Sequence, residues 1–178
     1  MSRPHFFALL LCLALLPTRF SQAELPPVRS VEQVDLQRYT GKWYEIAAIP
    51  MYFQRQCIGD TTAEYALLPD GEIEVTNRCR TENGFDQATG RAWPAAKEQS
   101  ARLKVSFFWP FRSDYWIIGL DADYRWAVVG NPNRKFLWIL SRTPQLPPME
   151  FERALKAATE QHFPLDQLKP TRQTETAP

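Results

Sequence analysis

Histidine and cysteine are scarce in this 178-residue sequence, which contains 2 histidines and 3 cysteines, and neither sign of charge dominates: 21 basic residues face 20 acidic ones. Few side chains are therefore available to hold a metal or to form a nucleophile–base pair. The net charge of +1 favours no nucleic-acid partner. Beyond residue 23, no apolar run is long enough to span a bilayer of ~30 Å as a helix.

Residues 1–23 have the pattern of a secretory signal peptide. Arg3 provides a positive start, and residues 6–16 form an apolar run that is too short for a transmembrane helix. Small residues at Ser21 and Ala23 occupy the positions that a signal peptidase inspects. We therefore predict export and cleavage before Glu24.

Cys12 lies inside this apolar run and raises the alternative of a lipid-modified bacterial cysteine. Lipidation favours a small residue directly before the cysteine, whereas Leu11 stands there. We favour a cysteine that serves as a small hydrophobe and is removed with the signal. Loss of Arg3 and Arg19 moves the formal charge from +1 to −1. The remaining chain suits a single domain.

Cys57 and Cys79 remain after cleavage. An even pair in an oxidising compartment favours a disulfide. Residues 68–71, Leu-Pro-Asp-Gly, are a hairpin turn signal that would bring the two flanks together. A metal site is the alternative, but His162 is the only histidine of the mature chain and lies far away in sequence. We predict a disulfide that contributes on the order of 3 kcal/mol.

Short strands separated by turn residues extend from residue 39 to residue 142. Ala63 and Tyr65, for example, alternate with Thr62 and Glu64, and this period of two predicts one buried and one solvated face. We predict eight strands, over residues 42–49, 60–68, 72–79, 90–94, 101–108, 114–120, 125–130 and 136–142. Eight antiparallel strands close into a barrel wide enough for one small ligand.

The last strands carry apolar residues on both faces, so their outer side needs a cover. Pro147 and Pro148 indicate a helix start, and apolar positions follow at helical spacing. These positions are Phe151, Leu155, Ala158 and His162. We expect this helix to pack outside the seventh and eighth strands. Residues 24–170 would then form the barrel with its helix, and residues 171–178 a disordered tail.

Two stretches about 100 residues apart carry the most information: residues 41–47, Gly-Lys-Trp-Tyr-Glu-Ile-Ala, and residues 138–142, Trp-Ile-Leu-Ser-Arg. Trp43 near the start of the first strand and Arg142 at the end of the last can stack only if the sheet closes on itself. Gly41 lets the backbone pass close to its neighbours. Between these stretches, Asp121, Asp123 and Tyr124 indicate a turn with local hydrogen bonds.

Together these stretches resemble the three conserved regions of the lipocalins, most closely the bacterial lipocalins and the apolipoprotein D-like branch. The resemblance covers about residues 34–169. It implies an all-β fold, an eight-stranded antiparallel up-and-down β-barrel with one C-terminal α-helix packed outside. It gives structural roles to the signature residues Gly41, Trp43, Tyr44, Asp121, Asp123, Tyr124 and Arg142.

The resemblance also implies a function: binding, storage or transport of fatty acids, lysophospholipids or other small apolar ligands in a bacterial envelope, supporting outer-membrane maintenance, with no cofactor. A periplasmic location follows from the signal, while an outer-membrane-associated lipoprotein is the alternative. Head-group selection would depend on polar residues at the mouth, for which Arg55, Arg78 and Lys104 are candidates.

Inward-facing aromatic residues are the candidates for the cavity wall: Tyr65, Phe107, Tyr115 and Trp138. Plain core packing is the alternative for each. A separate apolar group at a turn consists of Phe107, Phe108, Trp109 and Phe111. Exposing it is costly unless it touches a membrane, a lipid or a second copy, and burial against a neighbouring loop is the alternative. The chain would be a monomer or a homodimer.

Catalysis is disfavoured. His162 is expected on the outer helix, and a disulfide would consume Cys57 and Cys79, which leaves no nucleophile with a base. Asp121 and Asp123 lie in a turn, away from any apolar interior. We predict a binding protein, with a protein-interaction module or, less favoured, an isomerase-type enzyme acting on a bound lipid as alternatives.

Overall fold

The computed structural model describes residues 24–174. The predicted signal peptide and residues 175–178 lie outside this range. Eight long strands form the barrel: β1 (Gly41–Ala48), β2 (Gly59–Leu67), β3 (Ile73–Thr81), β4 (Gly84–Pro94), β5 (Arg102–Phe108), β6 (Phe111–Leu120), β7 (Trp126–Gly130) and β8 (Leu137–Ser141). The other elements are α1 (Leu36–Tyr39), η1 (Tyr52–Gln54), α2 (Pro148–Glu160), η2 (Leu165–Gln167) and β9 (Lys169–Pro170).

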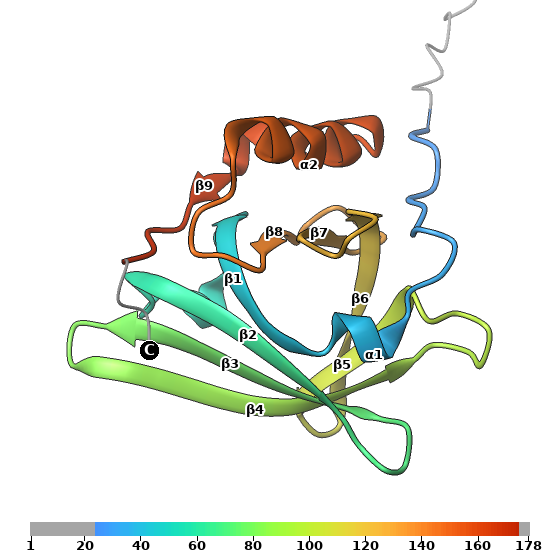
Figure 1. The fold of residues 1–178 in the computed structure, drawn as a ribbon, viewed down its shortest axis with the longest axis horizontal. Helices are drawn as coiled ribbons and strands as arrows, with labels where there is room; N and C mark the ends of the chain where they lie inside the picture. Colours follow the sequence, from blue (N-terminus) through green and yellow to red (C-terminus); the bar gives the residue numbers. More distant parts are fainter. Residues whose placement is uncertain (1–23, 175–178) are drawn as a thin grey trace, which may run out of the picture.

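Consecutive strands pair antiparallel from β1 to β8, and β1 also pairs with β8, which closes the barrel (Figure 1). Tyr44 lies opposite Thr62 on one side and Ser141 on the other. Inward and outward residues alternate along the strands because the side-chain period is two. The predicted fold class, an eight-stranded antiparallel barrel with one outer helix, is confirmed.

The strand boundaries agree with the predicted ones to within two residues, except for β4 and β6. β4 begins at Gly84 rather than at residue 90, and its residues 84–92 pair with the whole of β3. Residues 84–89 are exposed, so they show no alternation from which a strand could be recognised. β6 likewise begins at Phe111, in an exposed extension of the β5–β6 hairpin.

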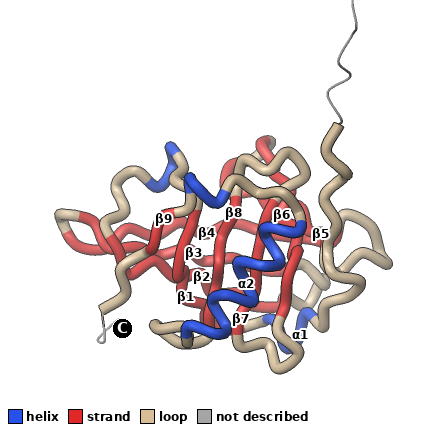
Figure 2. Tube along the Cα trace, turned by 90° about the horizontal axis from the view of Figure 1, so that it is seen from above, coloured by secondary structure: helices blue, strands red, loops and turns tan. Residues whose placement is uncertain are grey.

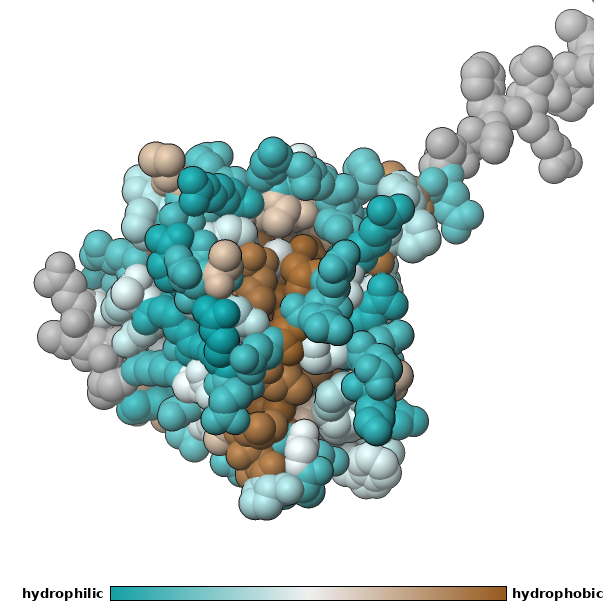
Figure 3. All heavy atoms as spheres, turned by 45° about the vertical axis from the view of Figure 1, so that its right-hand side comes forward, coloured by the Kyte–Doolittle hydropathy of each residue, from teal (hydrophilic) through white to brown (hydrophobic). Residues whose placement is uncertain are grey.

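Two hydrophobic clusters lie on opposite faces of the barrel wall. The inner cluster includes Trp43, Leu103 and Ile117, whereas the outer cluster joins Ile118 to Ala154 of α2. The neighbours Ile117 and Ile118 thus point into different clusters, which explains why the last strands are apolar on both faces. Figure 3 shows further apolar side chains gathered in a strip between hydrophilic flanks.

Helix α2 lies mainly on β6 and β7 (Figure 2), and Leu137 and Ile139 of β8 belong to the same hydrophobic cluster as its buried residues. The expected packing against β7 and β8 therefore omitted β6. Gly119 of β6 allows this approach, since a Cβ there would lie 2.8 Å from Cβ of Ala157. The expected place of His162 on this helix is also wrong. The helix ends at Glu160 and His162 has φ 59°, so Phe163 takes the buried place.

The C-terminal segment 171–174 fills a seam between β1 and β2. These strands pair only as far as Tyr44, after which β9 pairs with β1. The amide of Thr171 donates to the carbonyl of Ile46, and the amide of Asp60 donates to that of Arg172. The expectation of disorder over 171–178 is therefore wrong for 171–174, because exposed backbone groups of β1 and β2 bind this segment.

Candidate functional site

One end of the barrel is closed by the expected stack of Arg142 on Trp43. The guanidinium carbon lies 3.9 Å from the ring centroid, and Trp43 is fully buried. Gly41 has φ 86°, and a Cβ there would lie 3.4 Å from Nη1 of Arg142, so glycine suits this position. The guanidinium donates to four backbone carbonyls, those of Arg38, Thr40, Lys42 and Tyr124.

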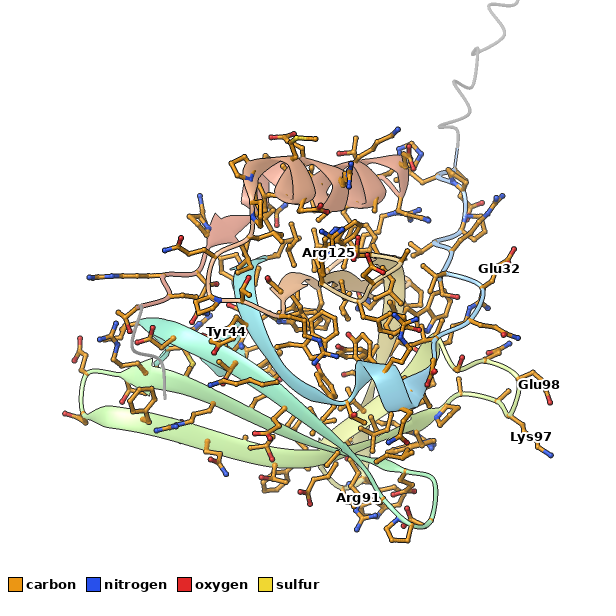
Figure 4. The ribbon with its side chains drawn as sticks, in the orientation of Figure 1. Glu32, Tyr44, Arg91, Lys97, Glu98 and Arg125 are labelled. Carbon is orange, nitrogen blue, oxygen red and sulfur yellow. A yellow bond between two sulfur atoms is a disulfide. The ribbon has the colours of Figure 1, made fainter. Side chains whose placement is uncertain are left out.

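The corner at Asp121 and Tyr124 is also structural. Asp121 accepts hydrogen bonds from the Arg125 side chain at 2.9 Å, and this bond is the main cause of its lowered pKa. Tyr124 Oη accepts the amide of Asp35, the residue that caps α1. Arg125, which lies below α2 in Figure 4, also forms an ion pair with Glu150 of α2 at 3.3 Å. The corner thereby ties α1 and α2 to the barrel, while Asp123 is exposed.

The predicted disulfide between Cys57 and Cys79 is confirmed, with Cα atoms 5.5 Å apart. It joins the β1–β2 connection to β3, and both cysteines lie on the wall of a cavity. The bond therefore fixes one side of that wall.

The cavity occupies the barrel interior with a volume of about 410 Å³. This lies within the range of typical small-molecule sites, ~300–1,000 Å³. Exposed aromatic residues surround its mouth, including Tyr52 and Phe53 on one side and Phe108 on the other. The four predicted wall residues, Tyr65, Phe107, Tyr115 and Trp138, all line it. Their contact with a ligand stays a prediction.

The cavity floor carries a hydrogen-bonded tyrosine cluster, which we define as Tyr39, Tyr65 and Tyr115. Tyr115 Oη lies 3.0 Å from Tyr39 Oη and 2.7 Å from Tyr65 Oη. Burial raises the pKa of all three phenols, so the hydroxyls stay protonated. Tyr65 and Tyr115 line the cavity, whereas Tyr39 packs behind them against Trp43 at 4.9 Å between ring centroids.

Glu45 is a buried carboxyl on the cavity wall, with 7% of its surface exposed. Thr171 Oγ1 donates to it at 2.5 Å and Gln54 Nε2 at 3.4 Å. Its pKa is raised, because burial penalises the charged form. Sequence reasoning missed this residue. The available signal was its position two residues after the inward-facing Trp43, on the same face of the strand.

Of the three head-group candidates, the structure places only Arg78 among the described wall residues. Its guanidinium lies 4.0 Å from the ring centroid of Phe85. Lys104 pairs instead with Asp114 at 2.6 Å. The cavity wall also includes the charged residues Asp86, Arg112 and Asp114. Arg91 points away from the barrel in Figure 4 and pairs with Glu72.

The β5–β6 hairpin presents an apolar lip at the mouth, which we define as Phe108, Trp109 and Phe111. These side chains are 80%, 76% and 74% exposed, so the expected alternative of burial against a neighbouring loop is wrong for them. Phe107 is less exposed and lines the cavity. Phe108 and Phe111 belong both to the lip and to the cavity wall.

Residues 24–174 contain no group of three metal-ligating side chains arranged to hold an ion. Within the same range, no helix is long and apolar enough to cross a membrane.

Comparisons with known sequences agree with this geometry. The profile of the lipocalin-like domain matches residues 34–173. The outer membrane lipoprotein Blc of Citrobacter freundii is 40% identical over 147 residues, 80% of this chain and 82% of its own. Temperature-induced lipocalin-1 of Arabidopsis thaliana is 37% identical over 83% of this chain and 84% of its own. Apolipoprotein D of Bos taurus is 37% identical over 69% and 67%, respectively.

Solved structures support the fold. Insecticyanin from the tobacco hornworm Manduca sexta superposes with a TM-score of 0.70 at 22% identity and covers 86% of this chain and 88% of its own. Lobster apocrustacyanin A1 gives a TM-score of 0.66 at 15% identity, over 80% of this chain and 81% of its own. At these identities the likeness concerns the barrel alone.

Proposed function

The chain belongs to the lipocalin family, and from this membership we propose that it binds and carries a single-chain lipid, a fatty acid or lysophospholipid, inside its barrel. The observation that carries the proposal is the cavity of about 410 Å³ with one closed end and one aromatic mouth. Burying an acyl chain yields ~0.8 kcal/mol per methylene. No cofactor and no turnover form part of the proposal.

A cavity-filling substitution tests this function. Ala88 lines the cavity, whereas its neighbour Thr89 points to the other face of β4 and bonds to Thr76. We expect Ala88→Trp to weaken binding of a fluorescent fatty acid at least about tenfold, the equivalent of losing two buried methylenes. Thr89→Trp is the matched control and should bind normally. Equal binding by both variants would place the ligand outside the barrel.

We propose that the chain is exported to the envelope as a soluble protein beginning at Glu24. The short apolar run and Leu11 before Cys12 support this form. The relatives called outer membrane lipoproteins support the anchored alternative. Intact-mass measurement of the mature chain separates the two, because a diacylglycerol adduct on Cys12 adds mass and excludes cleavage before Glu24. Native mass spectrometry of the same sample would show which lipid it carries.

We also propose that the lip contacts a lipid surface, because Phe108, Trp109 and Phe111 are exposed directly at the mouth through which a lipid would pass. Substituting all three with serine should reduce co-sedimentation with phospholipid vesicles severalfold. Met149→Ser provides the control, since Met149 of α2 is exposed and apolar but is not among the residues that line the cavity. Unchanged sedimentation together with loss of a dimer in light scattering would assign the lip to self-association instead.

A further inference from the structure

We propose that the end of the ligand that reaches the cavity floor carries an oxygen atom, which accepts a hydrogen bond from the tyrosine cluster. This inference rests on the proposed function and deepens it, because it names a chemical requirement of the ligand. A plain hydrocarbon end would not meet that requirement.

The tyrosine cluster has more hydroxyl protons than hydrogen bonds. The hydroxyls of Tyr39, Tyr65 and Tyr115 supply three protons, and the cluster contains two hydrogen bonds, each of which uses one. One O–H therefore has no partner within the cluster, whichever way the bonds are oriented. The hydrogen bonds of residues 24–174 give these three hydroxyls no other acceptor.

The orientation of the bonds decides where the spare proton points. If Tyr39 donates to Tyr115, the spare proton belongs to Tyr115 or to Tyr65, and both residues line the cavity. If Tyr115 donates to Tyr39, the spare proton belongs to Tyr39, which is 1% exposed and does not line the cavity. A buried donor without an acceptor is unfavourable, so the first two orientations prevail once a ligand oxygen is present.

The surroundings of the cluster make an oxygen the favoured occupant. Val75, Val105 and Leu140 supply the apolar part of the nearby wall and offer no side-chain acceptor. Arg142 lies beneath the cluster, stacked on Trp43, which packs against Tyr39. Its guanidinium donates to backbone carbonyls and takes part in none of the ion pairs of residues 24–174. A positive charge below the floor attracts the partial negative charge of an acceptor oxygen.

Two kinds of lipid can bring an oxygen to the floor. A fatty acid can enter with its carboxyl group first. A lipid with a large polar head must enter tail first, and its chain then needs an oxygen substituent near the far end. The chemistry at the floor is the same in both cases.

The first arm of the experiment uses a head group that cannot enter the barrel. Lysophosphatidylcholine with a plain acyl chain is compared with the same molecule carrying a terminal hydroxyl on that chain, by displacement of a fluorescent fatty acid. We expect the hydroxylated chain to bind about tenfold more tightly, the gain of one satisfied buried donor. Equal affinities would overturn the inference while leaving the proposed function intact. Absent binding of both would instead overturn the proposed function.

Variants locate the effect. Tyr65→Phe combined with Tyr115→Phe removes both hydroxyls that line the cavity, and the preference for the hydroxylated chain should vanish. Tyr39→Phe is the matched control: it removes a hydroxyl behind the wall and leaves Tyr65 and Tyr115 with one bond and one spare proton, so the preference should persist. A preference that survives the double substitution would overturn the inference. The wild-type comparison needs no variant and remains decisive if the double variant does not fold.

The second arm tests carboxyl-first entry with a plain dodecanoic acid. If its carboxyl reaches the floor, the double variant should bind it about tenfold more weakly than wild type does. If wild type and the double variant bind dodecanoic acid equally well, its carboxyl group stays at the mouth. The oxygen that binds the tyrosine cluster is then one at the far end of the acyl chain, as in the first arm.

Discussion

At the scale of single residues, Trp43 and Trp138 show how one side-chain type serves both ends of the barrel. Trp43 is fully buried, donates from its indole nitrogen to the carbonyl of Tyr39 at 2.9 Å, and supports Arg142. Trp138 lines the cavity and packs beside Phe136 with ring centroids 6.0 Å apart. The first holds the closed end together, and the second faces the space that a ligand would fill.

This difference predicts different consequences for the two alanine variants. Trp43→Ala should lower the free energy of unfolding by ~3–5 kcal/mol, since a large buried ring is lost. Trp138→Ala should mainly weaken lipid binding, because Trp138 is only partly buried and its removal enlarges the cavity. Denaturant titration and fluorescent fatty-acid binding measure the two effects. Equal destabilisation with unchanged binding in Trp138→Ala would contradict this division.

Glu45 predicts a pH dependence. Its folded-state pKa is raised by burial, so the folded protein binds this proton more tightly than the unfolded chain does. Its contribution to stability is therefore most favourable at acid pH and declines as pH rises from the unfolded pKa through the raised folded pKa. Glu45→Gln keeps an acceptor for Thr171 and avoids burying a charge.

We expect Glu45→Gln to have a higher Tm than wild type at pH 7–8 and the same Tm near pH 4, where both side chains are neutral. Glu64→Gln, on the exposed face of β2, is the control and should show no such trend. A Tm difference that is constant between pH 4 and pH 8 would show that the effect is packing rather than ionisation.

Contacts between single residues could be predicted from the sequence where residue type and position in the strands point to the same pairing. The Trp43–Arg142 stack follows from a closed sheet and two matching strand ends. The tyrosine cluster could not be predicted, because whether three hydroxyls meet within 2.7–3.0 Å depends on ring positions across α1, β2 and β6. Glu45 was missed because carboxyl side chains are rarely buried, although its position two residues after Trp43 placed it on the inner face of β1.

At the scale of elements, alternation predicted the strands wherever one face is buried. It failed over residues 84–89, all of which are exposed even though three of them line the cavity. Helical spacing predicted α2 but not its exact seat on β6 and β7, which the close approach of Gly119 to Ala157 decides. The docked segment 171–174 has no hydrophobic pattern, since hydrogen bonds to β1 and β2 hold it in place.

This segment predicts the effect of truncation. Gln173 Nε2 donates to the carbonyls of Glu45 and Thr61 at 2.8 Å each, and Asp60 accepts from the amide of Thr174 at 2.6 Å. Ending the chain at Pro170 should therefore cost about 2 kcal/mol of stability, a few net hydrogen bonds. Ending it at Thr174 is the control and should cost nothing. Equal stability of the two truncations would show that segment 171–174 does not support the seam.

At the scale of the whole molecule, the two ends of the barrel differ. Arg142, Trp43 and α1 close one end, and the exposed lip surrounds the other. A ligand can therefore enter from only one side, and the closed end limits how much of it fits. The family and the barrel could be predicted from the sequence motifs. The depth of the cavity could not, because it depends on how the side chains pack at the closed end.

Because the cavity has a fixed floor, we expect the affinity for a fatty acid to rise with the length of its acyl chain and to level off once the cavity is full. Each methylene that enters the cavity contributes ~0.8 kcal/mol, or about fourfold in affinity. Competition by saturated fatty acids of increasing length should show this rise, followed by a plateau once about 410 Å³ is filled. Phospholipids with two chains should compete more weakly than lysophospholipids of the same chain length, because an eight-stranded barrel has little room for a second tail. Affinity that is indifferent to length would mean that the chain does not enter the barrel, and it would favour a protein-interaction role for the apolar mouth.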